Sequence, residues 1–228
     1  MRLPAFFDDV PKLRVRDPLA DVLGCAEGGV FEYGYADAVR VTGHSCPTVA
    51  AAYWLTWLAL RALFPDSLPQ RGGVKVEFRG NARVGSTGVV ATVMQMLTGA
   101  AGGSGFKGIA GRYGRAGLMR FNPDLPLALR FTRLDSGVAV DAEADLSFPP
   151  PDPALEALLQ RCAKGTADPQ ALAELGRLWQ QRVQHLLLDL ANDPGVFTVR
   201  PVEQRRTGPS SRFLTLMPER RAWRTRSP

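Results

Sequence analysis

The segment that most constrains the fold is residues 47–64, which is apolar on nearly every side and is bounded by prolines. Pro47 suits the first position of a helix, where its missing N–H costs nothing, and Pro65 ends the helix. The apolar run before Arg61 has about twelve residues, too few to cross the roughly 30 Å of membrane hydrocarbon. A helix of this kind is therefore predicted to lie buried at the centre of a globular fold.

The rest of the body predicts an α+β fold, in which an antiparallel or mixed sheet packs against apolar helices. Residues 74–78 alternate apolar and charged side chains, the pattern of a half-buried strand. A second apolar helix is predicted over 89–97, and a hairpin over 127–133 and 138–143. Residues 31–41 combine aromatic and β-branched side chains and leave strand and helix both open.

Four parts are predicted along the chain. They are an extended N-terminal arm with a short helix at its end (1–20), the α+β domain (21–150), a helical extension (151–199) and a basic tail (200–228). Within the extension, Asp168 is a candidate N-cap for a long helix that reaches Leu190. Apolar residues recur along this helix at helical spacing and would pack on the body or on another subunit. They are Leu172, Leu175, Trp179, Val183, Leu186, Leu187 and Leu190.

The positive charge of the chain is concentrated at its C-terminal end. The formal net charge is +6, but eight arginines after residue 199 face only two acidic residues, and the first 199 residues contain 20 basic and 20 acidic ones. A nucleic-acid-binding domain normally carries its basic surface on the folded module. We therefore expect a solvated tail and no nucleic-acid partner.

The cysteines and the N-terminus indicate a cytoplasmic protein without a membrane segment. Cys25, Cys46 and Cys162 are an odd and widely spaced set, which does not fit a disulfide framework and is typical of a reducing compartment. The first residues lack the apolar core of a signal peptide.

Residues 43–47, Gly-His-Ser-Cys-Pro, carry the chemistry of the chain because they place a thiol at the start of the central helix. A thiolate there faces unpaired N–H groups and the positive end of the helix dipole. His44 and Cys46 could ligate zinc, iron or copper, since imidazole and thiolate suit these metals. They could also act as base and nucleophile. A buried cysteine beside a histidine bonded to the backbone fits the same residues, and the spacing does not choose.

A metal site would need further ligands, because zinc sites have about three or four protein ligands. Candidates are Cys25 and the carboxylates of Glu32, Asp37 and Glu77. His185, inside the long C-terminal helix, is expected to be a surface or packing residue.

The glycine-rich residues 99–117 could cradle an anion, because glycine lets backbone N–H groups converge and Lys107, Arg112 and Arg115 add positive charge. The passage lacks the Gly-Lys-Ser/Thr of a phosphate-binding P-loop, and it follows a helix, unlike a dinucleotide-binding fingerprint. A simple connecting loop fits equally well.

The order of these segments resembles a known family. Residues 43–47 before an apolar helix are followed by a lysine-bearing strand, a helix ending in Gln-Met-Leu-Thr-Gly, a glycine-rich turn with Lys107, and a hairpin. Over roughly residues 20–145, this series resembles the formylmethanofuran dehydrogenase E-subunit-like domain family. The resemblance implies an α+β domain that dimerises, with Cys46 and His44 lining a cleft and able to hold a metal. Many relatives end in a zinc ribbon, which helices replace here.

The leading functional hypothesis is a cytoplasmic, homodimeric, metal-binding protein of this family. His44 and Cys46 would hold one divalent metal ion, zinc preferred and iron or another transition metal open, or would act in catalysis. Lys107 and Arg112 would bind a small anionic substrate. Such a protein could be a small-molecule or redox enzyme. The alternative is a non-catalytic accessory module that docks on a redox enzyme complex.

Overall fold

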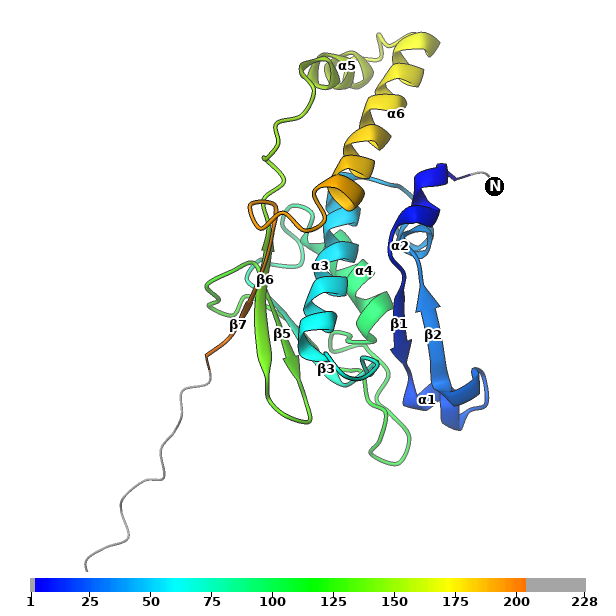
Figure 1. Cartoon of the computed structure of the whole chain (residues 1–228), viewed down its shortest axis with the longest axis vertical. Coiled ribbons are helices and arrows are strands. Elements are labelled where there is room, and N and C mark those ends of the chain that lie inside the picture. The colour runs from blue at the N-terminus through cyan, green and yellow to red at the C-terminus, as the bar shows by residue number, and fades with distance from the viewer. Residues whose placement is uncertain (1–2, 204–228) are drawn as a thin grey trace, which may run out of the picture.

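The computed structural model describes residues 3–203 and has the predicted α+β architecture (Figure 1). The helices are η1 (Ala5–Asp9), α1 (Pro18–Val22), η2 (Glu27–Gly29), α2 (Tyr35–Thr42), α3 (Pro47–Leu63), α4 (Thr87–Thr98), α5 (Pro153–Ala163), α6 (Pro169–Gln184) and the π-helical η3 (His185–Asp189). The strands are β1 (Leu13–Arg16), β2 (Val30–Tyr33), β3 (Val74–Phe78), β4 (Met119–Phe121), β5 (Leu129–Arg133), β6 (Ala139–Ala144) and β7 (Phe197–Pro201).

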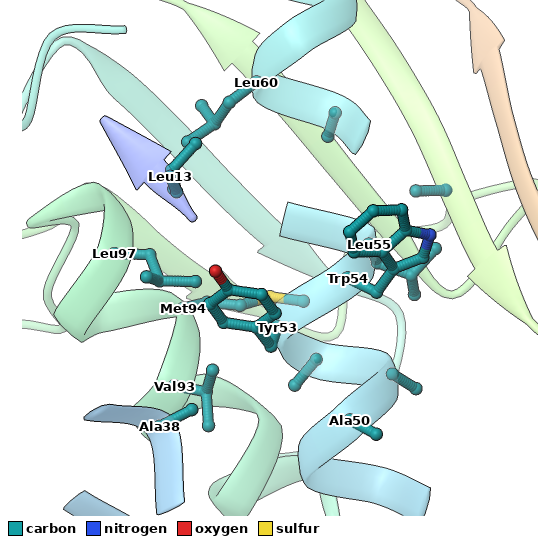
Figure 2. Close-up of a cluster of buried hydrophobic side chains, with 14 of the residues drawn as sticks. Leu13, Ala38, Ala50, Tyr53, Trp54, Leu55, Leu60, Val93, Met94 and Leu97 are labelled. Carbon is teal, nitrogen blue, oxygen red and sulfur yellow. The ribbon is translucent and has the colours of Figure 1, made fainter. Parts of the chain in front are cut away.

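Helix α3 is the buried centre of the fold, as the sequence predicts. It packs against α4 and α2 and against strands β6 and β7 of the large sheet. Figure 2 shows Tyr53, Trp54 and Leu55 of α3 in one apolar cluster with Met94 and other residues of α4. The indole N–H of Trp54, which is buried, donates to the carbonyl of Ala191 at 2.6 Å, so the polar atom of this large side chain is satisfied.

The large sheet is mixed and has the order β4-β3-β5-β6-β7. Strand β3 runs parallel to β4, while all other neighbours are antiparallel. The alternation predicted for 74–78 is confirmed, because Val74, Val76 and Phe78 are buried and the two charged residues between them are half-buried. The predicted hairpin is confirmed as β5 and β6, and the second apolar helix as α4.

The N-terminal segment is built into the core, although the sequence predicts an arm. Its extended part is β1, which pairs antiparallel with β2, and the short helix expected at its end is α1. Phe6, Phe7 and Leu13 belong to the main apolar cluster. The ambiguous residues 31–41 contain both elements, strand β2 and then helix α2, with Gly34 between them.

The C-terminal helices are inserted in the sequence between two neighbouring strands of the large sheet, so they are not a terminal extension. Helices α5 and α6 follow β6, and the chain then returns as β7 to complete the sheet beside β6. Asp168 caps α6 as predicted, by accepting from the N–H of Ala171 at 2.8 Å. Strand β7 takes up residues 200–201 of the predicted tail, and residues 204–228 lie outside the described part. Over the described residues, none of the helices is long and apolar enough to cross a membrane.

Candidate functional site

Cys46 occupies the N-cap of α3, as the sequence predicts. Its Sγ accepts a hydrogen bond from the backbone N–H of Val49 at 3.4 Å, and the extended backbone at Cys46 turns into the helix at Pro47. The side chain is half-buried and packs at the edge of the main core. The sulfur is therefore held by the first turn of the helix while part of the residue stays accessible.

His44 is exposed on the short connection between α2 and α3. Gly43 ends α2 in the left-handed region, with φ 78°, and this turns the chain back toward α3. The Nδ1 atom of His44 lies 3.0 Å from the carbonyl oxygen of Thr42. Because a carbonyl oxygen can only accept, this contact places the proton of the neutral imidazole on Nδ1 and leaves the lone pair on Nε2.

Ser45 fixes the connection to two distant parts of the chain. Its Oγ lies 2.9 Å from the hydroxyl of Tyr35 and donates to Oε1 of Gln180, also at 2.9 Å. The indole N–H of Trp179 donates to the Ser45 carbonyl at 2.9 Å. Burial raises the pKa of Tyr35 well above its usual value, so this hydroxyl stays neutral and can bond to Ser45. Helix α6 thus holds residues 43–47 in place.

Near the start of α3, the candidate metal donors among the described residues are His44 and Cys46. No group of three or more histidine, cysteine, aspartate or glutamate side chains that could hold a metal ion occurs among residues 3–203. Glu32 pairs with Lys12 at 3.2 Å and Glu77 with Lys75 at 2.9 Å. Asp37 accepts from Arg40 and from the Gly34 N–H, and Cys25 is exposed. The donors at His44 and Cys46 suit zinc in kind, but their number is incomplete.

His185 is exposed and lies 2.8 Å through Nδ1 from the carboxylate of Asp189, which agrees with the predicted surface position. A groove beside the first half of α3 has a volume of about 340 Å³ and opens between α3, α4 and the large sheet. Thr48 lines this groove, but His44 and Cys46 are not among its lining residues.

The residues expected to bind an anion separate in the structure. Arg112 lines a cavity of about 600 Å³ and lies with its guanidinium 5.2 Å from the ring centre of Tyr113. Lys107 is exposed and is not among the residues that line this cavity. Arg115 of the same loop also lines the cavity, and Arg16 and Arg71 reach it from two other segments.

Burial lowers the pKa of Arg115, and the charge of Arg71 lowers it further, against the opposite effect of Asp17. The sequence patterns do not single out Asp17, Arg16 or Arg71. In the sequence, each is only a charged residue near a proline or glycine. Residues 16–17, residue 71 and the glycine-rich loop come together only in the folded chain.

No protein-family model matches the chain, and no curated protein matches it either.

Proposed function

We propose that the protein binds a divalent transition metal, zinc by preference, through Nε2 of His44 and Sγ of Cys46. The observation that carries the proposal is the contact of His44 Nδ1 with the Thr42 carbonyl. Metal-binding histidines commonly donate their other ring N–H to a carbonyl or carboxylate, which fixes the tautomer and orients the ring. The sulfur two residues away supplies the second donor, with a chemistry that suits zinc.

With two protein donors, the metal needs further ligands from outside the described residues. Zinc prefers four ligands, so two copies of the motif would complete one ion, whereas solvent or a small molecule would leave an open site. The hydrogen bonds of Ser45 with Gln180 and Trp179 of α6 support either arrangement, because they hold residues 43–47 in one conformation before any ligand binds. Binding of the metal would need the thiolate form of Cys46 and a neutral His44, so metal affinity is expected to fall in acid.

The test is elemental analysis of the full-length protein purified without chelator, combined with its molar mass in solution. We expect at least a tenfold loss of bound metal in Cys46→Ser and His44→Gln, since altering even outer-shell partners costs about 10–100-fold in affinity. The matched controls are Cys162→Ser and His185→Gln, which alter an exposed thiol and an exposed imidazole elsewhere. One metal per two chains in a dimer would indicate a shared site. Wild-type protein without stoichiometric metal, or Cys46→Ser with undiminished metal, would remove the proposal.

A non-catalytic docking role is the second candidate, and the insertion between β6 and β7 favours it. Leu159 of α5 and Leu172 of α6 are 41% and 48% exposed on a pair of helices that extends past the rest of the fold (Figure 1). Apolar residues exposed on an element of this kind are suited to contact another chain.

A further inference from the structure

Three segments that are distant in the sequence enclose the cavity of about 600 Å³. They are residues 16–22 around α1, the connection at residues 70–72, and residues 112–115 of the glycine-rich loop. Helix α1 is labelled near the lower end of the folded part in Figure 1. The first two segments are joined by backbone hydrogen bonds, including Arg71 N–H to the Arg16 carbonyl at 2.8 Å, and the side chain of Arg115 joins the third to Asp17 at 2.6 Å. The cavity is thus formed by the fold itself and not by one flexible loop.

A buried charge network lies behind the cavity, which its two arginines, Arg71 and Arg115, line. The carboxylate of Asp17 accepts from Arg71 at 2.7 Å and from Arg115 at 2.6 Å. The side chains of Asp17 and Arg115 are only 6% and 9% exposed. Nη1 of Arg115 and Nε of Arg71 are buried without a hydrogen-bond partner. One carboxylate therefore balances two guanidinium groups, and the network lacks one negative charge in a place where unbalanced charge is costly.

The backbone makes room for this arrangement. Gly72 and Gly99 both have positive φ, and a Cβ atom on either residue would overlap the guanidinium group of Arg115. Two glycines, in a backbone conformation that other residues rarely adopt, thus leave the space in which Arg115 reaches Asp17.

The outer wall of the cavity adds more positive charge. Arg16 pairs with Asp21 at 3.0 Å, and both side chains are exposed to solvent. Arg112 is also exposed, and no carboxylate of the described residues pairs with it. Four arginines thus face two aspartates around one cavity, an excess of two positive charges.

We propose that this cavity binds a small molecule through a phosphate group. A phosphate monoester carries a charge of about −1.5 to −2 at neutral pH, which matches the excess, whereas a single carboxylate carries half as much. Guanidinium forks suit phosphate oxygens in geometry as well as in charge. The ring of Tyr113, with Pro18 and Val22, offers an apolar wall for the rest of the ligand. The site shares no residue with His44 and Cys46, so it does not depend on metal binding.

Isothermal titration calorimetry of the full-length protein with inorganic phosphate and pyrophosphate tests the proposal, with acetate as the singly charged comparison. We expect saturable binding of both phosphates, one per chain, and much weaker binding of acetate. Arg112→Gln should weaken phosphate binding about tenfold, the loss expected for one charge-assisted hydrogen bond. Arg16→Gln should weaken it in the same direction. Arg120→Gln is the matched control, because it removes an exposed arginine outside the cavity and should leave binding unchanged.

Three results would overturn the assignment. The first is the absence of saturable phosphate binding in the wild type. The second is acetate binding as tightly as phosphate. The third is phosphate binding that Arg112→Gln and Arg16→Gln both retain in full, since the anion would then sit elsewhere, for example on the arginines after residue 203. Because Arg112 and Arg16 lie at the exposed wall, both variants are expected to fold, which a melting curve verifies.

Discussion

At the scale of single residues, Asp17 connects distant segments of the chain through two buried ion pairs. Its carboxylate is 6% exposed and binds the guanidinium groups of Arg71 and Arg115. It also accepts from the backbone N–H of Leu19 at 3.0 Å, which caps α1. The N-terminal segment and the glycine-rich loop are thereby connected through one side chain, and removal of its charge would leave two guanidinium groups buried without compensation.

We therefore expect Asp17→Asn to destabilise the protein by about 3–5 kcal/mol, the cost of leaving buried charge unpaired. Urea denaturation followed by circular dichroism measures the loss. The control is Asp135→Asn, which breaks an ion pair with Arg133 in which the aspartate side chain is 64% exposed, so its effect should be far smaller. Equal losses in the two variants would show that burial of the network contributes little.

At the scale of helices and strands, residues with small side chains set how closely the central helix packs. Ala50 is fully buried on α3, which packs against α4, and it is one of the core residues labelled in Figure 2. Ala62 lies on the same helix but is exposed. The two alanines therefore compare the same substitution in a packed and an open environment.

Ala50→Leu is expected to destabilise the fold by about 1–3 kcal/mol, because a close-packed core accommodates added methylene groups only by shifting its neighbours. Ala62→Leu should change stability by less than about 0.5 kcal/mol, as is usual for surface substitutions. Urea midpoints of both variants measure the difference. A stable Ala50→Leu variant would contradict this close packing of α3.

Local sequence signals determine which helices and strands can be predicted from the sequence. Helix α3, strand β3 and the β5–β6 hairpin follow from local signals, namely prolines at helix ends, alternation and turn residues. Strand β7 has only a short alternation over residues 197–200, and it depends on pairing with β6 across the inserted helices. The hydrogen bond between Ser45 and Gln180 joins residues 135 positions apart in the sequence, and Arg115 and its partner Asp17 are 98 positions apart. Local patterns contain no information on such pairs.

At the scale of the whole molecule, the apolar stripe of α6 divides into two parts. Val183, Leu186 and Leu187, in α6 and the following η3, are buried in the main core, whereas Leu172 near the start of the helix is 48% exposed. The sequence leaves open whether the stripe packs on the body or on a second copy of the chain. The buried end packs on the body, whereas Leu172 at the other end and Leu159 of α5 are exposed to solvent.

The expected homodimer is therefore predicted to use the exposed end of α5 and α6. The double variant Leu159→Glu and Leu172→Glu should shift the protein from dimer to monomer in light scattering coupled to size exclusion. Its melting temperature at low protein concentration should change little, because neither side chain belongs to the core. Val84→Glu is the control, since Val84 is apolar and 65% exposed on a loop remote in sequence from these helices. A monomeric wild type, or a double variant that remains dimeric, would contradict an interface at these helices.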